Sequence, residues 1–133
     1  MSEPFPPPGP KAQLERGAVL TPKFDADGLI PAVAQHADTG EVLMVGYMNA
    51  ASLKLTLETG QAHYFSRSRQ ALWKKGETSG QIQTVVEMRV DCDQDAIVIR
   101  IQPQGDGGVC HTGEQSCFYR VVEGGALVRL VVP

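Results

Sequence analysis

The sequence predicts one α+β domain, made mostly of β-strands with one or two short helices. Its 133 residues suffice for a single domain with a core of its own. Short apolar runs separated by Gly, Asn or Asp recur along the chain, which is typical of strands joined by turns. One segment combines a helix start signal, apolar residues on one face and a helix stop signal.

Residues 1–16 are predicted to be a disordered, proline-rich tail, and residues 17–133 the single domain. The chain begins MSEPFPPPGP, and proline is excluded from helix interiors and central strands. This start lacks the basic and apolar regions of a signal peptide, and no stretch is apolar enough to cross a membrane. We therefore expect a cytoplasmic protein whose cysteines stay reduced.

A β-hairpin is expected after the tail. Residues 28–37 (GLIPAVAQHA) read as a strand, which Pro31 would confine to a sheet edge or to an irregular start. Residues 38–40 (DTG) favour a turn, and residues 42–48 (VLMVGYM) a buried strand.

A helix should follow the hairpin. Asn49 suits the N-cap, and Leu53 and Leu57 fall four residues apart on one face. Gly60 is placed to end the helix, and residues 62–66 then form a short strand.

The second half of the chain is predicted to be mostly strand. Residues 85–95 (VVEMRVDCDQD) alternate between the two faces of a strand, and residues 96–101 (AIVIRI) continue as strand. Residues 104–108 (QGDGG) read as a flexible loop. Residues 117–133 form two strands around the glycines at 124–125.

A cluster of cations stands out on this acidic chain. The net charge of −3 argues against a nucleic-acid-binding protein, so phosphate recognition requires a local basic site. Residues 66–80 (SRSRQALWKKGETSG) supply one, with hydroxyls and glycines that suit an anion and a Trp that could stack on a base. The alternative is an ordinary solvated loop. The candidate substrate-binding residues are Arg67, Arg69, Trp73, Lys74, Lys75, Thr78 and Ser79.

The three cysteines are candidate zinc ligands. Cys92, Cys110 and Cys117 match no zinc-finger or C-x-x-C spacing, and spacing alone slightly favours small buried residues over metal ligands. Three thiolates would leave one tetrahedral position for water, as in catalytic zinc sites. The acids around Cys92, and His111 directly after Cys110, favour the zinc interpretation.

Asp91, Asp93 and Asp95 are candidate magnesium ligands. Strand alternation would place them on one face, opposite Cys92, where their mutual repulsion calls for a cation. A solvated acidic edge is the alternative. Among the histidines, His111 is the best candidate for a general acid or base, and His63 stays an open alternative.

Six segments, in order, resemble the phosphoribosyl-AMP cyclohydrolase family. They are GLIPA (28–32), GEVLMVGYMN (40–49), TLETG (56–60), HYFSRSRQALWKKGETSG (63–80), DCDQD (91–95) and CHTGEQSCF (110–118). One departure is Gln81, where many relatives carry His after Ser-Gly. The length leaves no room for the pyrophosphohydrolase domain fused to some relatives, so a stand-alone enzyme is expected.

The resemblance implies an enzyme of histidine biosynthesis that hydrolyses the N1–C6 bond of the adenine ring of phosphoribosyl-AMP. It implies zinc on Cys92, Cys110 and Cys117, Mg²⁺ on the three aspartates, and an intertwined homodimer in which Cys92 joins the other two cysteines of its partner. A zinc-activated hydroxide would attack C6, and His111 would move the proton. The alternatives are a deaminase or pyrophosphohydrolase with the same metals, or a non-catalytic dimer stapled by zinc.

Overall fold

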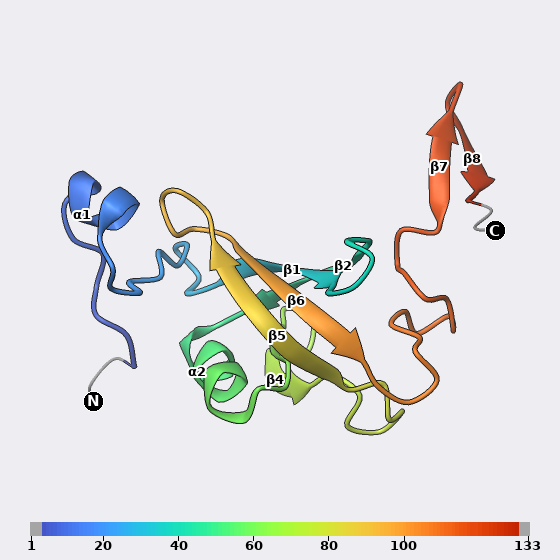
Figure 1. Cartoon of the computed structure of the whole chain (residues 1–133), viewed down its shortest axis with the longest axis horizontal. Helices are drawn as coiled ribbons and strands as arrows, with labels where there is room; N and C mark the ends of the chain where they lie inside the picture. The colour runs from blue at the N-terminus through green and yellow to red at the C-terminus, as the bar shows by residue number, and fades with distance from the viewer. Residues whose placement is uncertain (1–3, 131–133) are drawn as a thin grey trace.

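The computed structural model describes residues 4–130, which form a four-stranded sheet, two small hairpins and two helices (Figure 1). The mostly-β composition with two short helices confirms the predicted α+β class. The first three residues of the predicted tail and the last three of the closing segment lie outside the described residues. In chain order the elements are α1 (Lys11–Arg16), β1 (Ile30–His36), β2 (Val42–Met48), α2 (Ala50–Thr59), β3 (His63–Ser66), β4 (Ala71–Lys74), β5 (Gln83–Val90), β6 (Ile97–Pro103), β7 (Arg120–Glu123) and β8 (Ala126–Arg129).

The main sheet has the strand order β2-β1-β6-β5, so the first strand lies inside it. β1 pairs antiparallel with β2, which confirms the predicted hairpin, and parallel with β6. The edge strand that Pro31 suggested is wrong, because β1 has a neighbouring strand on each side, and the first residues of β1 pair with β2 in regular register. Pairing with β6 begins at Ala32, so the missing N–H of Pro31 costs no hydrogen bond on that side.

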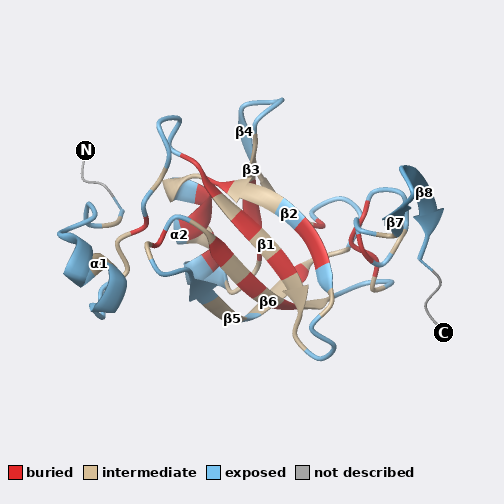
Figure 2. Ribbon diagram, turned by 90° about the horizontal axis from the view of Figure 1, so that it is seen from above, coloured by how far each residue is buried: buried red, intermediate tan, exposed pale blue. Residues whose placement is uncertain are grey.

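One face of the main sheet carries the core. Alternate residues of β1 and β6 are fully buried there. Helix α2 and strand β3 contact β2, and their Leu53 and Tyr64 side chains join the same buried cluster. Figure 2 shows the buried positions concentrated along β1, β2 and β6. The buried cluster includes Ile30, Ala32, Ala34, Leu43, Met48, Leu53, Tyr64, Ile97, Ile99 and Ile101.

Helix α2 begins and ends where the sequence predicts. The Asn49 side chain accepts a hydrogen bond from the backbone of Ser52, whose hydroxyl accepts one in return from the Asn49 backbone. Gly60 ends the helix in the left-handed conformation. Of the two leucines that fall four residues apart, Leu53 is buried but Leu57 is 48% exposed. Thr56 is buried instead, where its hydroxyl accepts a hydrogen bond from the backbone N–H of His63.

Two other segments differ from the sequence prediction. β4 forms a strand within the polar segment 67–80 and pairs with β3. β5 ends at Val90, so residues 91–95 form a turn and not the predicted strand. The turn closes because an Asp91 carboxylate oxygen accepts hydrogen bonds from the backbones of Asp95 and Ala96.

The two ends of the described chain extend to opposite sides of the sheet (Figure 1). Residues 11–16, predicted to belong to the disordered tail, form helix α1, and the Phe5 ring lies 6.5 Å from that of Phe24. The placement of a domain boundary at residue 16 stays a prediction. The β7–β8 hairpin confirms the two closing strands, and all of its residues are exposed. No helix among residues 4–130 is long and apolar enough to cross a bilayer.

Candidate functional site

The turn between β5 and β6 brings three carboxylates together. Asp91, Asp93 and Asp95 each offer a ligand oxygen, and these atoms lie within 4.8 Å of one another. The convergence was predicted, but its cause was not. A hydrogen-bonded turn gathers the side chains, and the predicted alternation along a strand, with Cys92 on the opposite face, does not occur.

The carboxylates of this acidic turn influence one another's pKa. Hydrogen bonds from Asp91 and Asp93, with their repulsion, raise the pKa of Asp95 to about 6. Partial burial alone would raise the pKa of Asp91, but hydrogen bonds from Asp95 and Ala96 leave it lowered. A bound cation would relieve this repulsion, and three hard oxygen donors fit Mg²⁺. Exposed acidic clusters are also common without a metal, so the support for Mg²⁺ comes from the type of donor atom.

A second cluster forms in the loop of residues 110–117, the cysteine loop. The backbone N–H of Cys110 donates to the Glu114 carbonyl (3.1 Å), and that of Cys117 donates to the Leu43 carbonyl (2.7 Å). The two thiols lie close enough for each to influence the pKa of the other. Desolvation, with the hydrogen-bonding influence and repulsion of Cys110, raises the pKa of Cys117 to about 11. Desolvation opposes ionisation of Cys110 too, but hydrogen bonds from Thr112 and Cys117 and the charge of Lys75 lower its pKa.

Lys75 lies against this loop. It follows β4 directly, and its Nζ atom donates a 2.5 Å hydrogen bond to the carbonyl of Val109, the residue before Cys110. Burial lowers the pKa of Lys75, while the charges of Cys117 and Cys110 oppose that shift. The sequence grouped Lys75 with the phosphate-binding cations, but this hydrogen bond directs its ammonium group to the cysteine loop.

Cys92 lies far from the other two cysteines. It is exposed in the acidic turn, at the start of β6, whereas the cysteine loop follows the other end of that strand (Figure 1). Seven residues of strand span about 20 Å. Among residues 4–130 the aspartates are the one group of three or more His, Cys, Asp or Glu side chains close enough to share a metal. The three thiols therefore do not meet within one chain.

The two candidate histidines have different surroundings. His111 is exposed, and its Nδ1 atom lies 3.9 Å from the Cys110 sulfur. His63 is buried, and its Nδ1 atom lies 2.8 Å from the Gln61 carbonyl oxygen. His111 is thus the histidine beside the thiols.

The cationic segment is divided between the two ends of the β3–β4 hairpin. Arg67 and Arg69 lie at its tip, and the guanidinium of Arg67 stacks 3.9 Å above the Tyr47 ring. Arg67 also lines a hollow of about 340 Å³ together with Asp27, Leu29, Asn49, Phe65 and Gln70. Lys74 lies at the base of the hairpin, so the structure does not gather all four cations.

The other predicted binding residues of this segment vary in exposure. Trp73 is half-buried, and its ring lies 5.3 Å from that of Tyr64, so part of its surface already packs against the core. Thr78 and Ser79 are exposed on the loop before β5.

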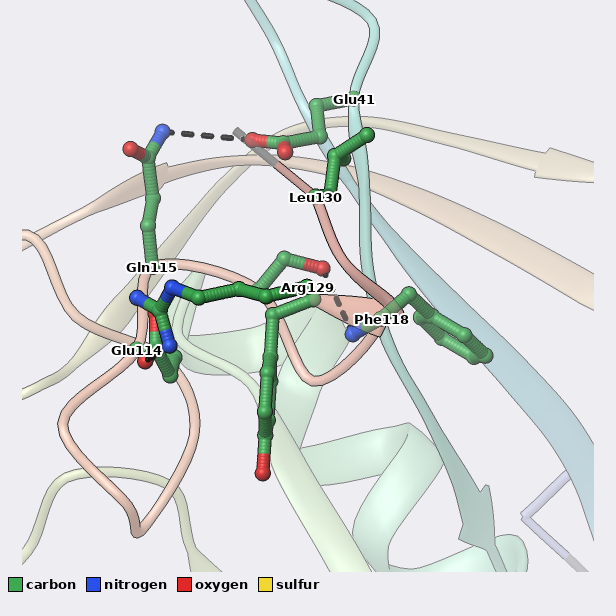
Figure 3. Close-up of a pocket in the computed structure, with 8 residues that line it drawn as sticks. Glu41, Glu114, Gln115, Phe118, Arg129 and Leu130 are labelled. Carbon is green, nitrogen blue, oxygen red and sulfur yellow. Dashed lines mark hydrogen bonds and ion pairs between the residues drawn. The ribbon is translucent and has the colours of Figure 1, made fainter. Parts of the chain in front are cut away.

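Sequence reasoning missed an ion pair that joins the cysteine loop to the C-terminal hairpin. Arg129 of β8 binds Glu114 through both terminal nitrogens of its guanidinium, at 2.6 and 2.9 Å (Figure 3). The pair lines a hollow of about 290 Å³ that Glu41, Phe118 and Leu130 also border. The separation of fifteen residues carries no local signal that could have revealed this contact.

Comparison with known proteins supports the resemblance seen in the motifs. A family model described as phosphoribosyl-AMP cyclohydrolase matches residues 44–119, more than half of the chain. The phosphoribosyl-AMP cyclohydrolase of a Caulobacter species is 67% identical over 94% of this chain and 93% of its own length. The enzymes of the same name from Caulobacter vibrioides and Brucella canis are 64% and 57% identical, over 97% and 94% of this chain and 93% and 91% of their own. The chain therefore belongs to the phosphoribosyl-AMP cyclohydrolase family.

Proposed function

We propose that this enzyme opens the adenine ring of phosphoribosyl-AMP by hydrolysing its N1–C6 bond, at zinc sites shared between two subunits. Relatives that carry the name of this reaction match nearly the full chain. The observation that carries the proposal is the cysteine loop, where two thiols, the imidazole of His111 and the ammonium group of Lys75 come together.

Cys110 and Cys117 of one subunit, with Cys92 of the other, would hold the zinc ion. Two neighbouring thiols that influence each other's pKa fit a metal, which would bind both sulfurs once they have lost their protons. When bound, zinc supplies a water that ionises near neutral pH. The three thiolates leave one ligand position for that water, which distinguishes a catalytic site from a closed structural one.

The proposed homodimer is supported by exposed apolar surface. The β7–β8 hairpin carries Val121, Val122, Leu127 and Val128 on a projection in which no residue is buried. Such a hairpin is typical of an arm that packs on a second copy. Cys92 and the cysteine loop lie at opposite ends of β6. A second chain could therefore supply the third thiolate of the zinc site.

The chain's own residues would carry out the proton transfers. In phosphoribosyl-AMP the ribosyl group on N1 makes the ring cationic, so C6 accepts the oxygen of water. His111 takes the proton at Nε2, because its Nδ1 atom faces the Cys110 sulfur. It then donates the proton to N1 as the N1–C6 bond breaks, which leaves a carboxamide and a formimino group.

The remaining candidate residues would orient the two phosphates. Asp91, Asp93 and Asp95 would hold Mg²⁺ against one phosphate, and the exposed tip of the β3–β4 hairpin, with Arg67, would bind the other. Lys74, Thr78, Ser79 and Arg69 are exposed or half-exposed polar groups available to the same ligand. Trp73 offers its remaining ring surface to the base.

Subunit complementation tests the shared site. Cys92→Ser and Cys110→Ser should each abolish zinc binding and turnover of phosphoribosyl-AMP. Mixing the two variants under conditions of subunit exchange should restore about one quarter of wild-type activity, because half of the dimers are mixed and each mixed dimer has one intact site. No recovery in demonstrated mixed dimers would refute the shared site.

The product identifies the reaction. Ring opening yields the carboxamide alone, whereas a deaminase would release ammonia and a pyrophosphohydrolase would release pyrophosphate. Zinc-loaded dimer that forms none of these products would support a purely structural metal.

A further inference from the structure

One buried residue joins the acidic turn to the N-terminal segment of residues 14–23. Gln94 lies between Asp93 and Asp95, yet it is only 4% exposed. Its Oε1 atom accepts a hydrogen bond from the Thr21 backbone (2.8 Å), and its Nε2 atom donates to the Leu14 carbonyl (3.0 Å). The backbone carbonyl of Gln94 accepts a further hydrogen bond from the Lys23 backbone (2.7 Å).

These contacts hold Gln94 in an unusual backbone conformation. Its φ of 57° lies in the left-handed region, which residues other than Gly, Asn and Asp rarely adopt. A buried amide needs partners for its oxygen and its N–H groups, and here the N-terminal backbone supplies them. The side chain can keep these partners only while the backbone turns in this way.

The conformation of Gln94 determines how the acidic turn is arranged. The Gln94 backbone N–H donates to the Asp91 carbonyl (3.1 Å), which closes the turn. Asp93 and Asp95 are its direct neighbours, so a rotation at Gln94 moves their carboxylates relative to Asp91. In Figure 1 the chain around α1 lies on the same side of the molecule as the β5–β6 turn.

We infer that Gln94 is a positioning residue for the acidic site and that residues 14–23 are its scaffold. The backbone of this segment holds Gln94, and Gln94 holds the carboxylates in the arrangement that a divalent cation needs. The inference rests on the proposed function of the aspartates. The segment lies outside residues 44–119, the part of the chain that matches the family model.

The test measures Mn²⁺ binding to the full-length protein by the loss of the free-ion electron paramagnetic resonance signal. Gln94→Ala should weaken Mn²⁺ binding about tenfold, the effect typical of residues that support metal ligands. Asparagine adopts a positive φ readily, but its side chain is one methylene shorter than that of glutamine. An equal loss of Mn²⁺ affinity in Gln94→Asn would therefore assign the effect to the lost hydrogen bonds with Thr21 and Leu14. The control is Gln13→Ala, an exposed glutamine in α1. Asp93→Asn reports whether the aspartates bind the ion at all.

Two further readouts separate positioning from general destabilisation. The Michaelis constant for substrate should rise in Gln94→Ala at low Mg²⁺ and return towards the wild-type value at saturating Mg²⁺, with kcat within about twofold. Hydrogen exchange of residues 14–23 should slow when Mg²⁺ binds the wild type and should not change in Gln94→Ala, because coupling between two sites is reciprocal.

The outcomes are distinguishable. Wild-type affinity for Mn²⁺ in both Gln94 variants, alongside lost affinity in Asp93→Asn, would overturn this inference and leave the proposed site intact. Equal Mn²⁺ binding by the wild type and Asp93→Asn would overturn the magnesium site and the inference together.

Discussion

The ammonium group of Lys75 donates a hydrogen bond to the backbone carbonyl of Val109, and this contact joins the end of β4 to the cysteine loop. Lys75→Met should leave the buried carbonyl unpaired, at a cost of about 1–3 kcal/mol in the free energy of unfolding. It should also raise the pKa of the Cys110 thiol, which the charge of Lys75 lowers. The pH dependence of thiol alkylation in metal-free protein measures the second effect. Lys74→Met is the matched control, and equal alkylation profiles in all three proteins would contradict the assignment.

Metal-free protein should lose stability as the pH rises through about 6. The pKa of Asp95 is raised in the folded chain, so the protonated carboxyl stabilises the fold below the pKa of an unfolded Asp, about 4. This stabilisation is lost as the pH rises through about 6. Asp95→Asn, which cannot ionise, should therefore unfold at a higher temperature than the wild type at pH 8 and at a similar temperature at pH 4. Thermal unfolding in the presence of a chelator measures both.

The control for this pair of measurements is Asp27→Asn, at an exposed carboxylate outside the acidic turn. Added Mg²⁺ should restore the stability of the wild type at pH 8 and leave Asp95→Asn unchanged. If the difference in unfolding temperature between the wild type and Asp95→Asn is as large at pH 4 as at pH 8, repulsion between the carboxylates is not its cause.

Substrate affinity should depend on Tyr47, although this residue has no charge. Its ring supports the Arg67 guanidinium at 3.9 Å, and a contact of this kind contributes about 0.5–1 kcal/mol at an exposed position. Tyr47→Leu should raise the Michaelis constant two- to fivefold. Tyr47→Phe keeps the ring and should behave as the wild type. Steady-state kinetics measure these Michaelis constants. A normal Michaelis constant in Tyr47→Leu would contradict the assignment of Arg67 to the substrate-binding site.

A charge on the C-terminal hairpin should break the dimer. Val122 is 72% exposed, so Val122→Asp introduces little strain within one subunit but places a carboxylate in the proposed interface. Light scattering should find monomers that retain wild-type circular dichroism and lack turnover. Val19→Asp makes the same change at an exposed valine of the N-terminal segment and should remain dimeric. A stable Val122→Asp dimer would exclude this position from the interface.

Local signals in the sequence predicted the elements that depend on a few neighbouring residues. Asn49 and Gly60 mark the ends of α2 because their side-chain and backbone requirements are met within one helical turn. The turn at residues 38–40 and the glycines at 124–125 marked two hairpins for the same reason. The motifs around the aspartates and cysteines predicted the family, which the comparisons confirm.

Features that join distant segments escaped prediction. Pro31 suggested an edge strand because a sequence does not show which strands flank it, and only the packed sheet shows that pairing with β6 starts one residue later. The hydrogen bonds from Lys75 to Val109 and from Gln94 to Leu14 span 34 and 80 residues. No periodicity relates positions so far apart.

The sequence by itself thus determined the type of most elements, the chemical groups available for metal and phosphate, and the family. The tertiary structure decided how these groups meet: a turn gathers the three carboxylates, Lys75 joins the cysteine loop, and Cys92 stays at the other end of β6 from that loop. The physical reason is the sequence separation over which each kind of interaction acts. Caps and turns are satisfied within a few residues, whereas the neighbours of a site are set by how strands pair and which faces are buried.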